Sequence, residues 1–423
     1  MDDTKKYSLI INYPYFFNIG GIEKYLYSFI KYCIDKEVRV IWLCETKYEI
    51  AESFKSILLS DKIERVPIKR CFFGWFKLEA LNLKKDEIYI LFCTSPIYMC
   101  INQDIIRQYS DYRFYPIYAI ASETDNTYFL EDYFNCSFIK NRVRHTMGKM
   151  IENWDLHNAV RCFNIHQLNS LEKKYSIKIQ NKEEKVLGVL KSQEDVSESF
   201  LRTKYRSRDI FTIITVSRFD FPHKAYLLGL IRAFGVVKVR YPQIHLQIIG
   251  YGPHKNKVID EIEKLPPMVK QSIELVGEVS PDNLNDYFKK ADLNISVAGA
   301  ATGGARVGTL TLVARNYCED VCEVYGYYDE SSNMTTSLIP GNDVEPYIEE
   351  VLSMNENDYV QKCLAGYQLL KTTKTPNPDY LFKTSEAVDL TVSGKEMCQM
   401  KIIRQMILFR RLLDKSKNVF KFR

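Results

Sequence analysis

Several patterns that mark common protein classes are missing from this sequence. Its 11 cysteines are scattered and none forms a CxxC pair, which argues against structural zinc and a disulfide framework and favours a reducing compartment. The Gly-x-Gly-x-x-Gly fingerprint of dinucleotide-binding proteins is absent, so an NAD-dependent oxidoreductase is disfavoured. The formal net charge is only +5, which permits contact with anionic lipid or a phosphate-bearing substrate. No basic stripe interleaved with stacking aromatics stands out, so no nucleic-acid partner is expected.

Long hydrophobic runs are missing too. The N-terminus, MDDTKKYSLI, begins with acidic residues and has no long apolar core, so no signal peptide is expected. The longest apolar stretch, residues 88–101, is interrupted by Thr94, Ser95 and Pro96 and is too short to span a bilayer. We therefore expect a cytoplasmic protein, either soluble or peripheral on the cytoplasmic face of a membrane.

What the sequence does contain indicates a folded α/β protein. Hydrophobic residues make up 46% and charged residues 26% of the 423 residues, which is ordinary for a globular chain of two or three domains. Apolar segments of strand length alternate with segments of helical periodicity, which is typical of a parallel sheet covered on both faces. We predict strands at residues 8–12, 38–44, 88–93, 114–121, 160–165, 211–217, 244–250, 273–277 and 293–297, and helices at 22–34 and 226–239.

One polar stretch, SQEDVSESFLRTKYRSR at residues 192–208, interrupts this alternation and is predicted to be a linker. The alternation starts again after it. The sequence therefore predicts two Rossmann-like domains, at residues 1–195 and 209–395, followed by a C-terminal helix at residues 396–423.

The C-terminal segment is basic. From Lys401 to Arg423 the chain carries eight Lys or Arg residues against one acid, Asp414, with apolar residues between them. A basic amphipathic helix can lie on an anionic membrane surface. The pattern fits equally a terminal helix that packs its apolar face on the fold, and the two interpretations are compatible.

Two places are predicted to bind a ligand, the first an anion or a sugar hydroxyl and the second a diphosphate. Gly20 and Gly21 follow the first predicted strand and open the first predicted helix, where a ligand can approach the backbone and free N–H groups. Arg218 and Lys224 follow the strand at 211–217, which places two cations at the carboxyl edge of a parallel sheet. Since Arg grips phosphate oxygens in a fork and Lys supplies a movable charge, we expect a nucleoside diphosphate. A tight glycine loop and a pair of surface cations are the simpler alternatives.

Several longer segments occur in a characteristic order: GGIEKYLYSFIKYC, SRFDFPHKAYLLGLIRAF, LQIIGYGP, LVGEVSPDNLNDYFKKADLNISV and a glycine-rich run. Together they resemble a retaining glycosyltransferase of the GT-B type, similar to the fourth sequence family (glycosyl transferases group one), which builds polysaccharides, lipopolysaccharides and glycolipids. The resemblance is strongest over residues 211–317 and fair over residues 8–34. It implies two Rossmann-like domains facing each other across a cleft, the acceptor on the first, the nucleotide sugar on the second, and the C-terminal helix crossing back to the first.

The resemblance also assigns roles to residues. The glycine pair would face the donor diphosphate or the acceptor, Arg218 and Lys224 would bind the donor phosphates, and the turn at Gly250 and Gly252 would lie near the nucleotide base. The leaving phosphate would itself take the proton of the acceptor hydroxyl in a front-face reaction. The resemblance implies no metal ion and no cofactor beyond the nucleoside diphosphate sugar that serves as donor substrate.

The chain departs from this family at a pair of carboxylates. The family has two Glu residues separated by seven positions after the strand predicted at 293–297, but this chain has no acid between Asp292 and Glu319. Ala301 and Thr309 stand at the equivalent places. Neither accepts hydrogen bonds as a carboxylate does, although Thr309 can contact a ribose hydroxyl.

Neighbouring residues in this stretch favour an anion instead. Gly303 and Gly304 are predicted to offer backbone N–H groups to a phosphate or sugar as a nest. Arg306 adds a cation. A charged donor sugar, or a diphosphate held differently, would suit such a pocket.

A second departure concerns histidine, which family members often place after the strands predicted at 88–93 and 114–121. No His follows either strand here. Glu123 and Asp125, after the second of them, are the best candidates for orienting an acceptor hydroxyl or the donor sugar, with solvated loop acids as the alternative. An inverting enzyme would need one of them as its general base.

We therefore expect a hexosyltransferase that moves a hexose from a nucleoside diphosphate sugar to a glycan or lipid-linked acceptor, in cell-surface polysaccharide or glycoconjugate synthesis. The missing carboxylates and His leave a second hypothesis, a catalytically inactive GT-B-like subunit that stabilises or targets an active glycosyltransferase. Other chemistries on the same fold, such as epimerisation, also stay open. Arg218 and Lys224 indicate a phosphate ligand under either of the first two.

Overall fold

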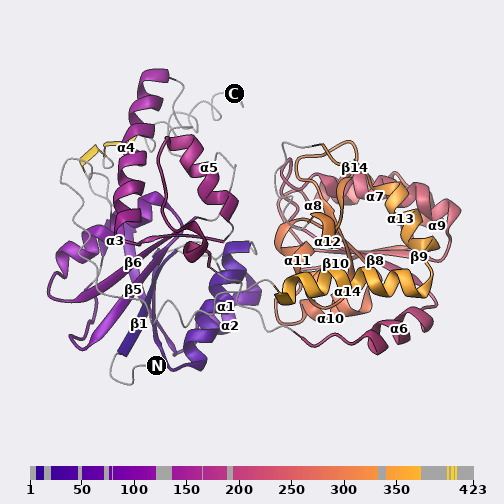
Figure 1. Cartoon of the computed structure of the whole chain (residues 1–423), viewed down its shortest axis with the longest axis horizontal. Helices are drawn as coiled ribbons and strands as arrows, with labels where there is room; N and C mark the ends of the chain where they lie inside the picture. The colour runs from indigo at the N-terminus through magenta and orange to yellow at the C-terminus, as the bar shows by residue number, and fades with distance from the viewer. Residues whose placement is uncertain are drawn as a thin grey trace. The chain divides into compact units, whose positions relative to one another are not determined.

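The chain forms two compact units in a computed structural model, the first from Met1–Leu190 with Thr375–Arg423 and the second from Lys191–Lys374 (Figure 1). The structure describes residues 6–13, 21–45, 50–70, 76–78, 80–120, 136–163, 165–187, 194–331 and 340–372, together with residues 398, 399, 402, 403, 405 and 406. The predicted α/β class with two parallel-sheet units is confirmed.

The first unit is a seven-stranded sheet in the order β4-β3-β2-β1-β5-β6-β7, parallel except for the antiparallel edge strand β4. Figure 1 shows α1 and α2 on one side of this sheet and α3 and α4 on the other. The strands are β1 (Lys6–Asn12), β2 (Arg39–Glu45), β3 (Ile63–Arg70), β4 (Phe76–Leu78), β5 (Glu87–Cys93), β6 (Arg113–Ile120) and β7 (Val160–Cys162). The helices are α1 (Gly21–Asp35), α2 (Glu52–Leu58), α3 (Pro96–Gln108), α4 (Ser137–Leu156), α5 (Ile165–Tyr175) and the 3₁₀ helix η3 (Lys182–Lys185).

The second unit is also a seven-stranded sheet, in the order β10-β9-β8-β11-β12-β13-β14. In Figure 1, α7 and α13 lie on one side of it and α6 and α14 on the other. The strands are β8 (Phe211–Val216), β9 (Ile244–Ile249), β10 (Ile273–Gly277), β11 (Leu293–Ser296), β12 (Leu310–Ala314), β13 (Glu323–Tyr327) and β14 (Asn342–Asp343). The helices are α6 (Glu198–Arg206), α7 (Tyr226–Arg240), α8 (Lys255–Glu263), α9 (Pro267–Lys270), α10 (Leu284–Lys290), α11 (Ala298–Arg306), α12 (Tyr328–Ser331), α13 (Val344–Ser353) and α14 (Glu356–Thr372).

Continuous apolar strands explain why the central sheet could be predicted. Every residue of β5 is buried, as expected for a parallel strand covered by helices on both faces. The edges differ from the prediction, because β13 pairs antiparallel with β12 and β14 pairs antiparallel with β13.

The predicted linker at residues 192–208 is wrong for its described part. Residues 198–206 form α6, which is capped by Ser197, whose Oγ accepts a hydrogen bond from the Phe200 N–H at 3.2 Å. Leu201 is fully buried in the core of the second unit. Arg202 pairs with Glu356 of α14 at 3.0 Å, so a polar amphipathic helix, and not a free connection, opens this unit.

The described C-terminal residues belong to the first unit, which confirms for them the predicted return of the C-terminal helix. Thr146 Oγ1 donates a hydrogen bond to Gln399 Oε1 at 3.1 Å, and Ile403 is 7% exposed within the first unit's core. Ile402 and Met406 are exposed. The predicted basic helix from Lys401 to Arg423 otherwise lies outside the described residues.

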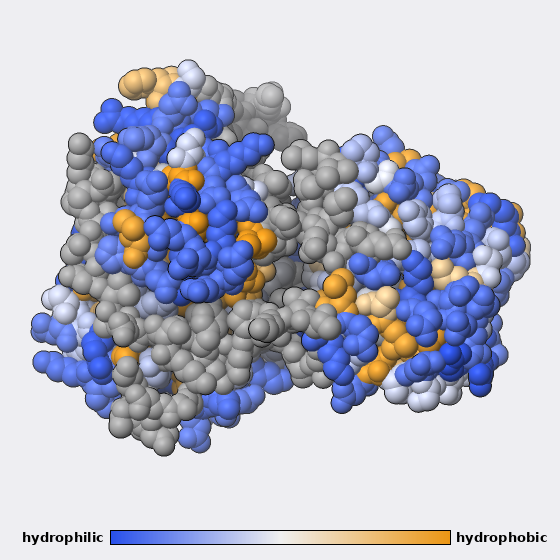
Figure 2. All heavy atoms as spheres, in the orientation of Figure 1, coloured by the Kyte–Doolittle hydropathy of each residue, from blue (hydrophilic) through white to orange (hydrophobic). Residues whose placement is uncertain are grey.

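The surface on view is mostly polar. Figure 2 shows hydrophilic side chains over most of the described face of the first unit, with apolar ones in small separate groups. None of the described helices is both long enough and apolar enough to cross a membrane.

Candidate functional site

The two predicted cations lie at the carboxyl edge of the second sheet. Arg218 follows β8, and its guanidinium Nη2 is 3.7 Å from Asp220 Oδ2, with both side chains substantially exposed. Lys224 Nζ donates a hydrogen bond to Asn316 Oδ1 at 3.1 Å, and Asn316 follows β12. Arg218 and Lys224 therefore place positive charge at the carboxyl edge of the sheet, near the ends of β8 and β12.

Helix α11 begins at the same edge, directly after β11. Val297 gives its N-terminus no side-chain cap and its first turn contains no acid. Ala298 has a φ of +46°, a left-handed conformation that a non-glycine residue rarely adopts. Free N–H groups at the positive end of a helix bind anions, so this terminus and the two cations form one candidate phosphate site.

Buried hydroxyl groups form hydrogen bonds at the strand ends beneath this edge. The Tyr226 hydroxyl lies 3.1 Å from Thr215 Oγ1, and Ser296 Oγ accepts a hydrogen bond from the Val216 N–H at 3.1 Å. Burial raises the pKa of Tyr226 to about 12. The bond between Val216 and Ser296 joins the ends of β8 and β11, and the contact between Thr215 and Tyr226 joins β8 to the start of α7.

Gly250 and Gly252 bring the turn after β9 against the loop that carries Arg218. A Cβ on Gly250, where φ is +149°, would lie 1.8 Å from the Ser217 carbonyl oxygen, and one on Gly252 would lie 2.7 Å from the Phe219 carbonyl oxygen. The Phe219 N–H also donates to the Tyr251 carbonyl at 2.8 Å. Close backbone approach explains both glycines, and their predicted place near a nucleotide base stays a prediction.

The predicted glycine nest is wrong. Gly303 and Gly304 lie inside α11, where helical backbone bonds use the N–H groups. A Cβ on Gly303 would lie 2.9 Å from the Phe288 ring, and one on Gly304 would lie 2.4 Å from Asn294 Nδ2. Both glycines let α11 pack closely on its neighbours. The glycine at the helix N-terminus is Gly299, which was not among the predicted site residues, and a Cβ there would meet no described atom within 4 Å.

Thr309 is also placed differently from its predicted role. It precedes β12 and so lies at the amino edge of the sheet, away from Arg218 and Lys224. The residue is 1% exposed, and its Oγ1 donates a hydrogen bond to the Phe288 carbonyl at 2.5 Å. A contact between Thr309 and a ribose at the carboxyl edge is therefore excluded by position.

Arg306 ends α11 and is buried. It is 6% exposed, and its Nη1 has no hydrogen-bond partner. Burial lowers the pKa of this guanidinium.

In the first unit, Gly20, Glu123 and Asp125 lie outside the described residues. Gly21 starts α1, and a Cβ on it would meet no described atom within 4 Å. This places open backbone at a second helix N-terminus, next to the carboxyl end of β1.

An unpredicted pair lies at this end of β1. The Tyr13 hydroxyl donates a 2.5 Å hydrogen bond to Glu23 Oε1, and the Glu23 residue is 8% exposed. Burial lowers the pKa of the adjacent Lys24 to about 8, which brings its titration near neutral pH. The sequence feature that could have indicated this pair is the dipeptide Glu23-Lys24 in the first turn of the helix that follows the glycine pair.

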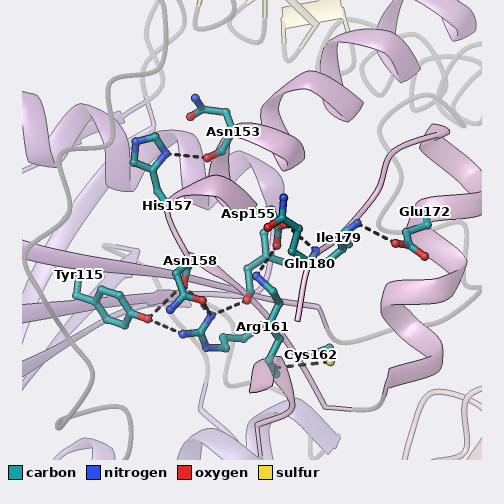
Figure 3. A network of polar contacts seen from close by, with 12 residues as sticks. Tyr115, Asn153, Asp155, His157, Asn158, Arg161, Cys162, Glu172, Ile179 and Gln180 are labelled. Atoms are coloured by element: carbon teal, nitrogen blue, oxygen red, sulfur yellow. Dashed lines mark hydrogen bonds and ion pairs between the residues drawn. The ribbon is translucent and has the colours of Figure 1, made fainter. Parts of the chain in front are cut away.

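A second polar network lies elsewhere in the first unit (Figure 3). The buried Arg161 of β7 donates from Nη1 to the Asn158 carbonyl at 2.7 Å and from Nη2 to the Tyr115 hydroxyl at 2.5 Å. Lys185 pairs with Asp155 at 2.6 Å. Since Asn158 precedes β7 and Tyr115 is near the start of β6, this network marks the amino edge and stabilises the fold there.

Metal ligation was not expected. Within the described ranges, no three or more His, Cys, Asp or Glu side chains are arranged to hold an ion. Metal independence stays a prediction.

Comparison with solved structures shows the fold. The structure is similar to Anabaena HepE in complex with UDP and glucose, with a TM-score of 0.56 at 11% identity, over 90% of this chain and 100% of that one. It is also similar to WaaG, a glycosyltransferase involved in lipopolysaccharide biosynthesis (TM-score 0.50, 12% identity, 87% and 96% covered), and to a trehalose-6-phosphate structure from E. coli bound with UDP-2-fluoro glucose (TM-score 0.52, 8% identity, 90% and 98% covered).

The chain therefore has the GT-B fold. No protein-family model matches it, and no curated protein matches it by sequence.

Proposed function

We propose that the protein transfers a hexosyl group from a nucleoside diphosphate sugar to a glycan or lipid-linked acceptor. The observation that carries the proposal is the placement of Arg218, Lys224 and the uncapped N-terminus of α11 at the carboxyl edge of the neighbouring strands β8, β11 and β12. Its ligand should be multiply anionic and able to approach backbone closely, as a diphosphate is. The similarity to folds that hold UDP with a sugar supports this choice of ligand.

The chemistry follows from this placement. As the bond between the sugar and the diphosphate breaks, negative charge develops on the departing phosphate, and two cations and free N–H groups stabilise it there. We propose a retaining, front-face transfer in which a phosphate oxygen takes the acceptor proton, as the resemblance to retaining glycosyltransferases implies; the family's pair of carboxylates has no counterpart between Asp292 and Glu319. No metal is required in this scheme.

Thermal shift against UDP, GDP, ADP, CMP and their common sugar conjugates tests the site. One nucleotide should raise the midpoint selectively, since it binds only the folded state. Arg218→Ala should weaken its affinity about ten- to a hundredfold through the loss of a charge-assisted contact. Arg240→Ala is the matched control, because Arg240 ends α7 at the opposite edge and pairs with Glu349. Equal effects of the two variants would refute the site.

A non-catalytic subunit is the second candidate, favoured by the acid-free stretch around α11. Such a protein would bind the nucleotide sugar through Arg218 and Lys224 without turnover. Product analysis with the identified donor and a panel of acceptors separates the candidates: release of free nucleoside diphosphate coupled to glycan growth identifies the enzyme, and binding without release identifies the subunit.

We further propose that cations between Lys401 and Arg423 attach the protein to an anionic membrane surface, where a lipid-linked acceptor would be found. Replacing Arg410, Arg411, Lys415 and Lys417 by Gln should reduce binding to phosphatidylglycerol vesicles and leave nucleotide binding unchanged. Unchanged vesicle binding would contradict this attachment.

A further inference from the structure

Helix α4 has one buried face and one basic face. Its inward side packs in the core of the first unit through Val143, Met147, Met150, Ile151 and Trp154. On the outward side, four exposed residues follow each other at intervals of four, three and four positions and so form one basic stripe: Phe138, Arg142, His145 and Lys149. From Ser137 to Ile151 the helix contains no Asp or Glu. No acid of the same stretch therefore offsets the charge of the stripe.

The basic stripe lines a groove on the surface of the first unit. The groove has a volume of about 390 Å³, and its lining also includes Asn141, Thr146 and Gln399. Gln399 reaches it from the C-terminal segment, where its Oε1 accepts the hydrogen bond of Thr146. Among the residues that the structure describes, no acidic side chain pairs with Arg142 or Lys149. Since small-ligand sites measure about 300–1,000 Å³, one anionic headgroup can enter the groove beside these cations.

Exposed apolar side chains accompany the groove. Phe138, at the start of α4, is 71% exposed. Ile402 and Met406, which follow Gln399 in the C-terminal segment, are exposed as well, while Ile403 between them belongs to the core of the first unit. Figure 2 shows an apolar group at one end of α4 with hydrophilic side chains around it. Cations combined with outward aromatic and aliphatic side chains are typical of surfaces that bind at the boundary between anionic headgroups and acyl chains.

The start of α4 lies toward the carboxyl edge of the first sheet. The helix ends at Leu156, shortly before β7 begins at the amino edge beside the parallel strand β6. Its 20 residues span about 30 Å, and the eight residues of β6 span about 26 Å, so the helix crosses the whole sheet. Phe138 and Arg142 therefore stand toward the carboxyl edge, the edge at which α1 begins with Gly21.

We propose that this face of α4 docks on an anionic lipid membrane, with headgroup phosphates at Arg142 and Lys149 and with Phe138 inserted among the acyl chains. The inference goes beyond the nucleotide site and does not depend on sugar transfer. It adds a contact on the folded first unit to the attachment proposed for residues 401–423. An acidic glycan would satisfy the cations, but the exposed aliphatic side chains of Ile402 and Met406 favour a bilayer.

Sedimentation of the full chain with vesicles of phosphatidylglycerol and phosphatidylcholine tests the two cations. Arg142→Gln combined with Lys149→Gln should lower the partition coefficient about tenfold or more, because each cation near an anionic surface contributes roughly fivefold. Lys62→Gln combined with Lys85→Gln is the matched control, since these exposed cations precede β3 and β5 at the amino edge, and it should stay within about twofold of the wild type. The thermal midpoint and nucleotide affinity should be unchanged in both double variants.

Phe138 reports on insertion into the bilayer. Phe138→Ser should lower the partition coefficient about tenfold, because an apolar side chain is lost from the acyl boundary. Phe138→Trp should keep vesicle binding and add an emission shift to shorter wavelength that the wild type, with its native tryptophans, does not show. Pure phosphatidylcholine vesicles should bind the wild type weakly, and added salt should weaken binding to the anionic vesicles.

Four outcomes would overturn the proposal. Vesicle binding of the Arg142 and Lys149 double variant within twofold of the wild type would remove α4 from the contact. Equal losses in this variant and its control would show a response to net charge alone. Binding to soluble hyaluronan that needs the two cations, without an emission shift of Phe138→Trp on vesicles, would assign the groove to an acidic glycan. Absence of vesicle binding by the wild type would refute this surface and the attachment through residues 401–423, and would leave the proposed nucleotide site standing.

Discussion

Glycines in this protein differ in what a methyl group at their position would touch. At Gly250, a Cβ would collide with the carbonyl oxygen of Ser217, whereas at Gly299 it would meet no described atom within 4 Å. The first glycine is required by the fold. The second stands at an exposed helix N-terminus, at the same sheet edge as Arg218 and Lys224, where the proposed ligand would use the open space.

Alanine substitution should therefore separate folding from binding. Gly299→Ala should keep or slightly raise the thermal midpoint, because alanine is the better helix former by about 0.5–1 kcal/mol, while the added methyl weakens nucleotide affinity. Gly250→Ala should lower the free energy of unfolding by about 3 kcal/mol through backbone collision and strain. Urea unfolding and nucleotide titration measure the two effects. Wild-type nucleotide affinity in Gly299→Ala would contradict the proposed ligand position.

The sequence could locate these residues only in part. Arg218 and Lys224 were predictable because they follow a continuously apolar strand, and strand ends meet at one edge. The error at Gly303, Gly304 and Thr309 arose because a spacing along the chain does not show where α11 begins and ends. Arg306 could be named as a cation, but its burial depends on the distant Tyr328.

At the scale of elements, one ionic cluster joins α7 to α8. Arg232 Nε donates to Glu261 Oε1 at 2.6 Å, and Arg232 Nη1 donates to the carbonyls of Glu319 and Asp320 at 2.9 Å. Lys264 is 2.9 Å from Glu261 Oε2. The hydrogen bond from Arg232 holds the pKa of the buried Glu261 carboxyl below its ordinary value, against the opposing effect of burial.

The lowered pKa of Glu261 determines how the unfolding free energy changes with pH. A carboxyl whose pKa is lowered by folding contributes stability above its unfolded pKa and loses it as the pH falls through the lowered value. The difference in unfolding free energy between wild type and Glu261→Gln should be constant above about pH 5 and shrink in acid. Glu263→Gln, at an exposed partner of Lys270, is the control with little effect at any pH. Chemical unfolding from pH 7 to pH 3 measures both, and a difference that grows in acid would contradict the assignment.

The segment predicted to be a linker shows how a helix can be missed in a sequence. Helix α6 contains few apolar residues, and only Leu201 among them is fully buried, so its composition resembles a solvated connection. Tertiary contacts place this helix in the second unit. Arg202 and Arg206 both pair with Glu356, which lies 150 or more positions later in the sequence. A local pattern cannot contain that information.

At the scale of the whole molecule, the first unit should depend on residues near the far end of the chain. Ile403→Ala removes a side chain from the first unit's core and should cost about 2–4 kcal/mol of unfolding free energy. Ile402→Ala, at a neighbour that is 55% exposed, should cost little. Nucleotide affinity should be unaffected by either change, since the candidate phosphate site lies in the second unit. Equal destabilisation by the two substitutions would refute the packing of this segment.

The division of the first unit between the two ends of the chain affects the order in which the units can be completed during synthesis. Residues 191–374 form an uninterrupted unit, whereas the first unit is assembled from chain on both sides of it. The ribosome therefore releases a complete second unit while the first still has an unfilled place for Ile403. Domains usually mature in the order in which they are translated. Here we expect the reverse order, in which the first unit is completed only after the residues around Ile403 have been translated.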